Sequence, residues 1–520
     1  NITLLKAKVG ILAVSCLSIT ALFACVDKDA RSDLSPNLPT DQAQNGDFGD
    51  QGGGSDQGLN FPVFDDGVLA FPGAEGYGKN ATGARTGEGR EIYHVTNLND
   101  AGPGSFRDAV SKPWRIIVFD VSGVIKLSKD PVVLKSNQTI LGHTAPGDGI
   151  VLYNGRVSAS GAQNLIVRYL RIRMGAAYPS DQVDACGVAN GANMIFDHCS
   201  MTWGRDECFS INPDGKGTAP KNITIQNSII GQGLQNHSCG GLMQTDISNG
   251  CTIFRNLYID NKTRNPKVKG LNQFVNNVVY NWGSGAAYNM GGDSSGKSET
   301  TIENNYFIVG PCNNWQNVEI APKVYEAQQV PMNPARPFTG GNSDFRSYCK
   351  GNYYDYDKDG SLNGIEITEV NWSQYCSGSP TLLEARSDLH PIIRSQKSAQ
   401  EAYEWVVEKV GAYLPVRDEV DKYLIDELTS LGGKGTIIQD ERKTEQFPLG
   451  GPGTINAAQK PLDSDNDGMP DAFEDAWGLD KYDPTDAVKE AKNGYLNIEN
   501  YALSLEYPDE YEYELNKNKQ

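Results

Sequence analysis

A short basic segment stands out in an acidic chain. The 520 residues carry 65 acidic and 46 basic side chains, which give a formal net charge of -19. Residues 255–269 run against this trend, because they hold one acidic residue, Asp260, and the basic residues Arg255, Lys262, Arg264, Lys267 and Lys269. Guanidinium and ammonium groups form strong, charge-assisted hydrogen bonds with carboxylates. The segment is therefore suited to hold an acidic ligand, whereas the overall charge argues against a nucleic-acid partner.

Three carboxylates upstream of this segment could complete a reactive site. They belong to Asp184, Asp206 and Glu207. Calcium prefers oxygen ligands, so a calcium ion could bridge these carboxylates to an anionic sugar while the basic residues hold the sugar's own carboxylates. Ion pairs on the protein surface would use the same residue types. The charges by themselves leave both interpretations open.

Residues 463–474, DSDNDGMPDAFE, match the spacing of a calcium-binding loop. Such a loop places oxygen ligands at its positions 1, 3, 5, 9 and 12 and a glycine at position 6. Gly468 is the sixth residue here, and the ligand positions are filled by Asp463, Asp465, Asp467, Asp471 and Glu474. The spacing predicts a structural calcium site near the C-terminus.

A second segment, DYDKDGSLNGIE at residues 355–366, has a similar spacing. Its candidate ligands are Asp355, Asp357, Asp359, Asn363 and Glu366. No helical pattern precedes this loop, and Gly360 also suits an ordinary Asp-Gly turn. A second calcium loop and a plain turn both remain open.

A repeat indicates which elements position these residues. Similar segments of nine residues begin at Asn164, Asn193, Asn222, Cys251, Asn272 and Thr300. Each segment alternates apolar and polar residues, which is the periodicity of a β-strand. Repeats at intervals of about 20 to 30 residues are typical of solenoids, in which each turn buries its apolar face against its neighbours.

The sixth position of the repeat favours one kind of solenoid. That position is occupied by Tyr169, His198, Asn227, Asn256, Asn277 and Asn305. Stacked asparagines at the bend of successive coils can satisfy backbone groups that burial would leave unpaired. We therefore predict an all-β fold, a parallel β-helix, over residues 69–345.

Other parts of the chain have different patterns. Residues 398–431 carry apolar residues at helical spacing, which predicts helices that pack on the solenoid. We expect residues 346–460 to form loops and helices on the β-helix, and residues 461–510 to form the calcium-binding segment. The chain has ten cysteines. Those in apolar strand-like segments are predicted to be buried thiols, and a disulfide between Cys349 and Cys376 stays open.

The N-terminal residues have the composition of an export signal. Lys6 and Lys8 precede an apolar stretch that ends at Leu22-Phe23-Ala24-Cys25. A basic start, an apolar core and small residues at the end are typical of a signal peptide over residues 1–24. The ending resembles a bacterial lipobox, which implies a lipid on Cys25 and attachment to the outer membrane, at the cell surface. A periplasmic or secreted protein is the alternative. Residues 25–68 are rich in Gly, Asp, Gln and Ser and predict a flexible tether.

Several motifs together resemble the pectate lyase family, polysaccharide lyase family 1, in the form found in Bacteroidetes. They are FPGAEGYG from Phe71, YHVTNLNDAGPGSFRDAV from Tyr93, IVFDVSGVIKL from Ile117, ILGHTAPGDGI, FDHCSMTWGRDE and TRNPKVKG. The resemblance covers residues 70 to about 435. It implies a right-handed parallel β-helix that cleaves pectate or pectin of plant cell walls by calcium-assisted β-elimination, giving 4,5-unsaturated products.

The resemblance also assigns roles to residues. Arg264 takes the place of the catalytic base, and Lys269 takes the place of an arginine that holds a substrate carboxylate. Lys267 and Lys262 are expected to assist in substrate binding. Asp184 and Asp206 match calcium ligands, and we expect Glu207 to complete that set.

Two family positions differ in this chain. Ser210 stands where a third carboxylate is expected, and Cys239 lies near the expected position of a substrate-binding lysine. The first change predicts a thinner calcium site unless Glu207 contributes a ligand, and the second removes an expected substrate-binding group.

Two other functions fit parts of the pattern. A β-helical hydrolase of the polygalacturonase type would use paired carboxylates around a water molecule, for which the same acidic residues could serve. A surface glycan-binding protein would use the groove without catalysis. Neither alternative explains the segment that contains Arg264, and the oligomeric state is not indicated by the sequence.

Overall fold

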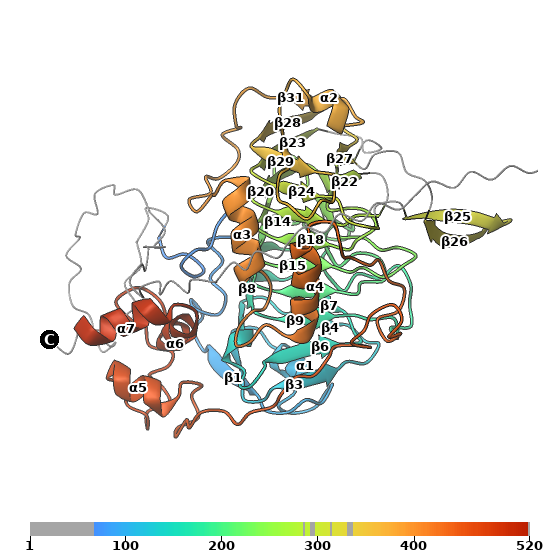
Figure 1. The fold of residues 1–520 in the computed structure, drawn as a ribbon. Helices are drawn as coiled ribbons and strands as arrows, with labels where there is room; N and C mark the ends of the chain where they lie inside the picture. Colours follow the sequence, from blue (N-terminus) through green and yellow to red (C-terminus); the bar gives the residue numbers. More distant parts are fainter. Residues whose placement is uncertain (1–66, 284–285, 292–296, 313–314, 330–335, 518–520) are drawn as a thin grey trace, which may run out of the picture. The chain divides into compact units, whose positions relative to one another are not determined.

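The chain winds into a parallel β-helix built from three sheets (Figure 1). The computed structural model describes residues 67–283, 286–291, 297–312, 315–329 and 336–517. Each coil contributes one strand to each sheet, so neighbours in a sheet come from successive coils. Apart from β30 and the β25–β26 hairpin, the described strands pair in parallel. The predicted fold class is confirmed.

The first two sheets run the full length of the solenoid. Sheet 1 consists of β1 (Glu91–Val95), β2 (Arg115–Phe119), β5 (Gln138–Leu141), β8 (Gln163–Arg168), β11 (Ala192–Asp197), β14 (Lys221–Gln226), β17 (Gly250–Phe254), β20 (Leu271–Val275), β23 (Ser298–Glu303), β28 (Phe345–Lys350) and β31 (Thr381–Leu382). Sheet 2 consists of β3 (Gly123–Lys126), β6 (Ile150–Tyr153), β9 (Arg171–Arg173), β12 (Ser200–Thr202), β15 (Ile229–Gly231), β18 (Leu257–Ile259), β21 (Val278–Tyr280), β24 (Tyr306–Ile308), β29 (Asn352–Asp355) and β30 (Ile365–Ile367). The coils thus continue past residue 345.

The third sheet is shorter, and the remaining elements surround the solenoid. Sheet 3 consists of β4 (Val132–Val133), β7 (Val157–Ser158), β10 (Cys186–Val188), β13 (Phe209–Ile211), β16 (Leu242–Gln244), β19 (Lys267–Lys269), β22 (Ala286–Asn289) and β27 (Arg336–Thr339). The hairpin is formed by β25 (Trp315–Ala321) and β26 (Val324–Gln329). The helices are α1 (Phe106–Ala109), the 3-10 turn η1 (Gly142–Thr144), α2 (Trp372–Tyr375), α3 (Ala399–Lys409), α4 (Glu419–Thr429), α5 (Asp471–Trp477), α6 (Asn497–Glu506) and α7 (Pro508–Lys517).

Apolar residues stack from coil to coil inside the solenoid. Leu165 pairs with Met194, which pairs with Ile223, and all three are buried in the same core. Side chains alternate between the two faces of a strand. Parallel pairing without slippage therefore places every inward residue against another inward residue, which is the pattern that the repeat predicted.

The predicted asparagine column is divided between two neighbouring columns. Gln226 pairs with Phe254, so the register aligns Asn227 with Arg255 rather than with Asn256. The sequence alignment was therefore wrong by one residue at this coil, because the repeat shortens there. One column, with backbone in the left-handed region, contains Tyr169, His198, Asn227, Arg255, Asn276 and Asn304.

The second column is a continuous buried ladder. The amide of Asn256 donates to the side-chain oxygen of Asn277 at 2.9 Å, and that of Asn277 donates to Asn305 at 2.8 Å. Asn305 in turn binds Asn352 in the next coil. Each side chain thus bridges two coils and satisfies buried polar groups, as predicted for Asn256, Asn277 and Asn305.

Helices α3 and α4 cover the outer face of sheet 2. Val406, Leu424 and Leu428 pack against outward residues of this sheet, among them Ile259 and Tyr280. Ser398 caps α3 through a capping box with Glu401, and Asp418 caps α4. Both helices confirm the prediction from residues 398–431.

The C-terminal segment packs on the outer face of sheet 1 near the first coils (Figure 1). Its buried residues Met469, Phe473 and Ile498 join Ile116 and Val118 of β2 in one apolar cluster. Residues 463–517 are thus part of the same compact unit as the β-helix.

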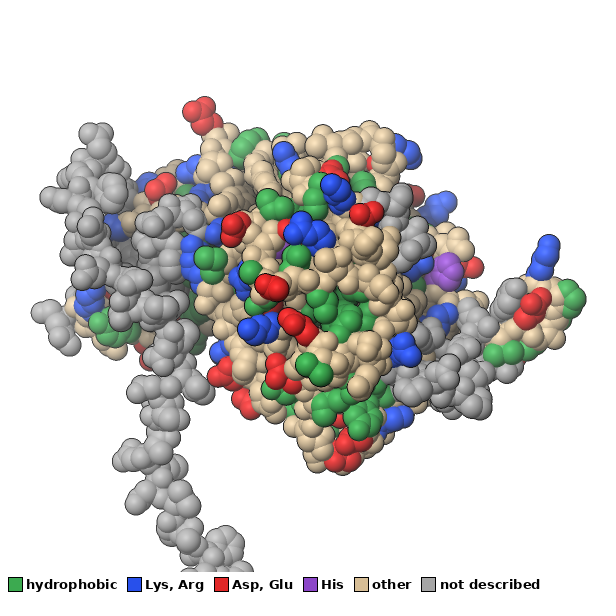
Figure 2. All heavy atoms as spheres, turned by 90° about the horizontal axis from the view of Figure 1, so that it is seen from above, with side chains coloured by type: hydrophobic (Ala, Val, Ile, Leu, Met, Phe, Trp, Pro, Cys, Tyr) green, Lys and Arg blue, Asp and Glu red, His purple; other side chains and the backbone are tan. Residues whose placement is uncertain are grey.

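The surface carries charges of both signs (Figure 2), and the described cysteines are unpaired. The face seen from the β31 end carries interspersed acidic and basic side chains (Figure 2). The eight cysteines among the described residues are free thiols, and Cys349 is not bonded to Cys376. No helix in the described ranges has both the length and the apolar character that a membrane span requires.

The ladder provides a test of the fold. We expect Asn277→Ala to lower the free energy of unfolding by about 2 kcal/mol, since it removes buried hydrogen bonds to Ile253 and from Asn256. Urea unfolding would measure the change. The exposed Asn212→Ala is the control, for which we expect a change within about 0.5 kcal/mol. Equal stability of the two variants would contradict the role of the ladder.

Candidate functional site

The candidate residues gather on the turns that precede strands of sheet 3. Asp184 comes just before β10, Glu207 just before β13 and Arg264 just before β19. Isolated parallel bridges join Glu207 to Cys239 and Cys239 to Thr263, so these turns stack in register. Residues far apart in the sequence thus become neighbours, because each coil returns to the same edge.

Arg264 lies directly against the carboxylates. Its guanidinium contacts Glu207 and lies 3.5 Å from an oxygen of Asp206. The side chain of Arg264 is 30% exposed, whereas that of Glu207 is 3% exposed. The backbone of Arg264 adopts a left-handed conformation, with φ of 57°. The arginine therefore bridges a buried acidic group and the surface of the molecule.

Sequence reasoning missed one member of this group. The Nδ1 atom of His237 lies 3.3 Å from an Asp206 oxygen, and its side chain is 45% exposed. The only feature of the sequence that could have indicated a role for His237 is its position in the NHSCGG segment, one coil before Arg264.

Burial raises the pKa values of the three acidic residues, and repulsion between them adds to the effect. Burial, followed by a hydrogen bond with Asp184 and repulsion from it, raises the pKa of Glu207 to about 7. Burial also raises the pKa of Asp184, and burial with repulsion from Glu207 raises the pKa of Asp206. A group of carboxyls with raised pKa values is suited to accept a cation, because its charge is incompletely compensated.

The charge of Arg264 is stabilised by the same carboxylates. Burial by itself would lower the pKa of Arg264. Attraction to Glu207 and Asp206, together with the hydrogen bond to Glu207, outweighs this effect, and the pKa of Arg264 is raised. In this state the guanidinium is a cation and not a base.

The predicted lysines differ in their positions. Lys267 and Lys269 flank the buried Val268 on β19, so both side chains point away from the core. Lys262 is buried, and its ammonium donates to the carbonyl of Asn236 at 2.7 Å. Burial lowers the pKa of Lys262. Lys262 thus fastens a neighbouring loop, while Lys267 and Lys269 lie on the outer surface next to Arg264.

The two departures from the family pattern have local structural roles. The hydroxyl of Ser210, on β13, accepts a hydrogen bond from the Leu242 amide at 3.1 Å. Cys239 is buried, and burial raises the pKa of its thiol, so it is unreactive. Neither residue adds a charged group to the site.

The acidic residues of the site fit a calcium ion. Asp206 and Glu207 offer ligand atoms that lie, with the sulfur of Cys239, within 4.8 Å of one another. Among the described residues, Asp184 is in no such group, so Asp206 and Glu207 form the centre of the candidate site. Hard carboxylate oxygens are the donors that calcium prefers.

The two predicted calcium loops differ in the structure. In the loop at 355–366, Asp359 accepts from Ser361 and Asn363, and Glu366 is an exposed residue of β30. Among the described residues, the groups of closely spaced metal-ligand atoms include none from this loop, that is, none of Asp355, Asp357, Asp359, Asn363 or Glu366. The loop at 463–474 does bring together Asp463, Asp465 and Asp467.

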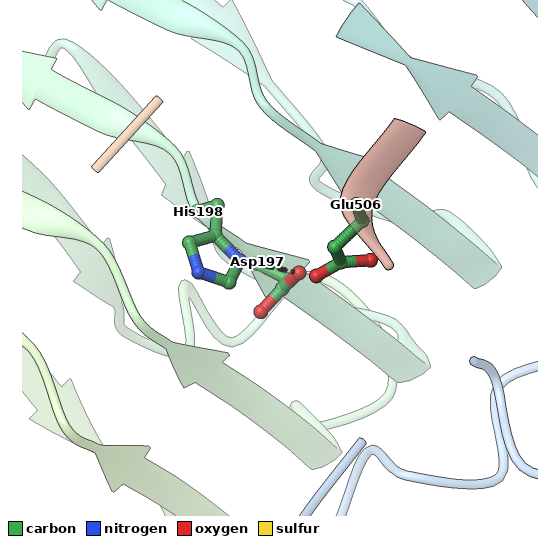
Figure 3. Close-up of side chains that lie close together, drawn as sticks. All are labelled: Asp197, His198 and Glu506. Carbon is green, nitrogen blue, oxygen red and sulfur yellow. Dashed lines mark hydrogen bonds and ion pairs between the residues drawn. The ribbon is translucent and has the colours of Figure 1, made fainter. Parts of the chain in front are cut away.

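A buried polar network joins the C-terminal helix to the β-helix. Asp197, His198 and Glu506 lie close together (Figure 3), and their ligand atoms are within 4.8 Å of one another. Arg168 lies between the acids, donating to Glu506 at 2.7 Å and to Asp197 at 2.9 Å. Tyr169 also donates to Glu506, at 3.0 Å.

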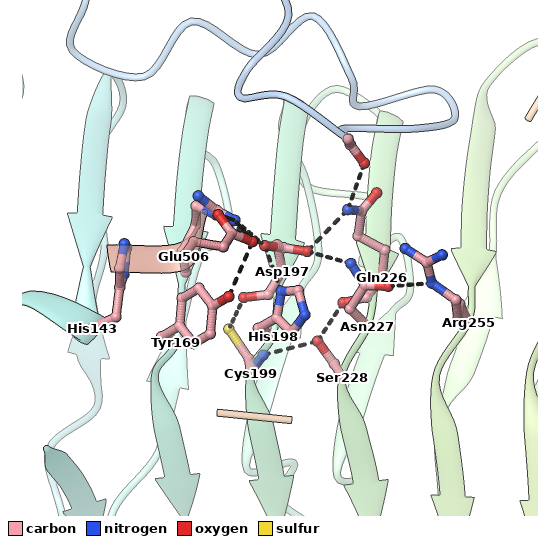
Figure 4. Close-up of polar contacts among 12 residues, drawn as sticks. His143, Tyr169, Asp197, His198, Cys199, Gln226, Asn227, Ser228, Arg255 and Glu506 are labelled. Carbon is pink, nitrogen blue, oxygen red and sulfur yellow. Dashed lines mark hydrogen bonds and ion pairs between the residues drawn. The ribbon is translucent and has the colours of Figure 1, made fainter. Parts of the chain in front are cut away.

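Protein donors occupy the carboxylate of Asp197. His198, Gln226 and Asn227 lie within 2.9 Å of its carboxylate oxygens (Figure 4). Attraction to His198 and Arg168, with these hydrogen bonds, outweighs burial, and the pKa of Asp197 is lowered. The Nε2 atom of His198 is buried without a hydrogen-bond partner. The network holds α6 on the coils.

Comparisons with known proteins identify relatives of the chain. A family model described as pectate lyase matches residues 70–324. The curated protein "Probable pectate lyase C" of Aspergillus fumigatus is 49% identical over 438 residues, which cover 84% of this chain and 94% of the relative. The protein of that name from Aspergillus flavus is 47% identical over 447 residues, covering 86% and 96%. The solved structure of jun a 1, the major allergen from cedar pollen, aligns with 66% of this chain and 93% of its own at 17% identity and a TM-score of 0.43.

The buried network provides a second stability test. We expect Glu506→Ala to lower the free energy of unfolding by about 3 kcal/mol, because it leaves Arg168 buried with one partner fewer. Chemical denaturation would measure this. Glu510→Ala, at an exposed position of α7, is the matched control and should change stability by less than about 0.5 kcal/mol. If both variants lose the same stability, Glu506 does not anchor the helix.

Proposed function

Because the chain belongs to the pectate lyase family, we propose that it cleaves pectate-type polyuronides by β-elimination. The observation that carries this proposal is the contact of Arg264 with Glu207 and Asp206 beside the outward lysines of β19. In this arrangement Arg264 can remove a proton from a uronate, and the lysines can bind the uronate carboxylates. The substrate class is the acidic polysaccharide of plant cell walls, pectate or pectin.

The basic residues first hold and orient the polymer. Lys267 and Lys269 pair with the carboxylates of successive uronate units. Because both side chains lie on one face of β19, they fix the chain along the outside of sheet 3. The positive charge of these lysines also allows an anionic polymer to approach a protein of net charge -19.

Arg264 then takes the proton from C5 of the bound uronate. The electron pair of the C5–H bond forms the double bond between C4 and C5, and the glycosidic oxygen leaves C4 with the C4–O bonding pair and takes up a proton from water. To act as a base, Arg264 must lose the attraction of Glu207 and Asp206, which keeps its pKa raised in the present structure. Asp184, Asp206 and Glu207 would hold a calcium ion. When bound, calcium draws charge from the uronate carboxylate, which acidifies the C5 proton and stabilises the enolate-like intermediate.

The N-terminal residues support a proposal about location. The basic start, the apolar stretch and the lipobox-like end at Cys25 favour export, with a lipid anchor in an outer membrane as in Bacteroidetes. Residues 1–66 lie outside the described residues. The curated Aspergillus relatives are fungal, so this proposal rests on the sequence alone.

One assay tests the reaction class. The protein is incubated with polygalacturonate, and ultraviolet absorbance of the unsaturated product is followed with and without a chelator. We expect absorbance to increase with calcium and to stop with chelator, because the acidic site requires a cation. New reducing ends without absorbance would indicate hydrolysis, and no cleavage would indicate a binding protein. Either outcome would overturn the proposal.

Arg264 provides a sharper test. We expect Arg264→Ala to lower kcat about 1,000-fold, since the group that removes the proton is lost. Arg346→Ala is the matched control, because Arg346 pairs with Glu299 on sheet 1 and should leave the rate unchanged. Rates come from the same absorbance assay. Full activity of Arg264→Ala would refute the assignment.

A further inference from the structure

Five carboxylates converge near the C-terminus, and one of them lies outside the predicted loop. Asp463, Asp465 and Asp467 offer oxygens within 4.8 Å of one another. Asp467 also belongs to a second group of this kind, with Glu474 and Asp486. Asp467 is common to both groups, so the five side chains form one continuous acidic cluster around it. Asp486 follows α5 in the chain and did not enter the sequence prediction.

Four of the five carboxylates, all but Asp463, keep at least one oxygen without a protein partner, whereas Asp463 accepts the backbone amides of Asp467 and Gly468. Glu474 is 0% exposed, and both of its carboxylate oxygens lack a hydrogen bond. Asp467 and Asp486 are 3% and 4% exposed, and each leaves one oxygen unpaired. Unpaired buried carboxylates are strongly unfavourable unless a cation compensates them. Such an arrangement points to a ligand.

The paired oxygens explain why the free ones point inward. One oxygen of Asp467 accepts the Met469 amide at 2.8 Å, and one oxygen of Asp486 accepts the Asp480 amide at 3.0 Å. These bonds fix each carboxylate and leave its second oxygen unpaired within the cluster. Glycine at position 468, with φ of 93°, permits the turn that brings them together.

Asp471, the predicted ligand at loop position 9, is engaged elsewhere. One of its oxygens accepts the Ser464 amide, and the other accepts the Ser464 hydroxyl, both at 2.8 Å. Asp471 is in neither of the two groups of ligand atoms. The fifth carboxylate of the cluster is therefore that of Asp486.

We propose that Asp463, Asp465, Asp467, Glu474 and Asp486 bind one calcium ion. The donors are all carboxylate oxygens, which suit a hard cation with six to eight oxygen ligands. Among the described residues, Lys460 lies 3.4 Å from Asp463 and 3.0 Å from Asp120, and Lys489 attracts Asp486, so cations of the protein compensate the cluster in part. This site is separate from the one at Arg264, and the proposal does not depend on the proposed function.

The bound ion fastens the C-terminal segment to the first coils. A side chain at Gly468 would meet Ile92, Val118 and Ile498 at 3.3 Å, so the loop rests directly on sheet 1. Met469, the next residue, is fully buried in the same apolar cluster. The ion joins this loop to α5 through Glu474, and to the segment between α5 and α6 through Asp486. Calcium thus stabilises the packing of α5 and α6 on the β-helix.

Hydrogen exchange of the full chain tests the fastening. The protein is freed of calcium with a chelator and compared with and without added calcium, and exchange is read in peptides from α5 and α6. We expect calcium to slow exchange there by about tenfold or more, because local opening must release the ion. Because the readout is confined to these peptides, calcium at the Arg264 site does not affect it. Unchanged exchange would overturn the proposal, whether or not any variant folds.

Three variants test the ligand set. We expect Asp486→Asn to raise the calcium concentration needed for this protection about tenfold or more, since it removes a charged ligand. Asp483→Asn is the matched control, because Asp483 pairs with Lys489 at 3.0 Å in the same arm, and it should change the value less than about twofold. Asp471→Asn should also stay within about twofold.

The three variants decide whether Asp486 or Asp471 is the fifth carboxylate ligand. Equal calcium requirements for Asp486→Asn and Asp483→Asn would exclude Asp486 as a ligand. A loss with Asp471→Asn as large as that with Asp486→Asn would favour the twelve-residue spacing and overturn the assignment of Asp486, rather than Asp471, as the fifth carboxylate ligand.

Discussion

Parallel pairing between successive coils is the constraint on which both the fold and the site depend. Neighbouring strands in a sheet lie about 4.8 Å apart. A residue and its counterpart one coil later are therefore neighbours, however many residues lie in the loop between them. This brings Glu207, Cys239 and Thr263 side by side on three turns, and Arg264 reaches back across two coils to its carboxylates. A slip of one residue in any strand would turn these side chains toward the other face.

Burial of polar groups is the second constraint, and the molecule meets it in three ways. The asparagine ladder satisfies backbone and side-chain groups through neutral hydrogen bonds between coils. Around Asp197, charge is met by Arg168 and by several neutral donors. At Glu474 and Asp486, no donor of the described chain meets the free oxygens. In the first two arrangements protein groups pair the buried amides and carboxylates, whereas the third leaves carboxylate oxygens that the proposed cation would compensate.

Local pattern was enough to predict most of the fold. Strand alternation located the inward residues, and helical spacing located α3 and α4. The alignment failed between Asn227 and Arg255, because it matched Asn227 with Asn256 by residue type, whereas the register pairs Ile223 with Cys251 and Ile225 with Ile253. Only pairing between coils shows the correct register.

The contacts that escaped prediction are those made across long separations in the chain. Glu506 meets Arg168, His237 meets Asp206, and Asp486 joins Glu474 from beyond the loop. No spacing rule relates these residues, since folding of the C-terminal segment and the length of each turn decide where they lie. The motif around Arg264 was visible because its residues are adjacent in the sequence. The partners of Arg264 could be assigned only by resemblance, and their contact emerged from the stacking of coils.

The electrostatics of the Arg264 site explain how an arginine can serve two states. Arg264 compensates the buried Glu207, on a turn that also holds Asp206. The same attraction raises the pKa of Arg264. In the proposed reaction, positive charge taken up by the carboxylates would weaken this attraction and favour loss of the guanidinium proton. The carboxylates of a bound polyuronate would act in the opposite direction, so the proposed role of Arg264 as a base depends on a cation at the acidic residues.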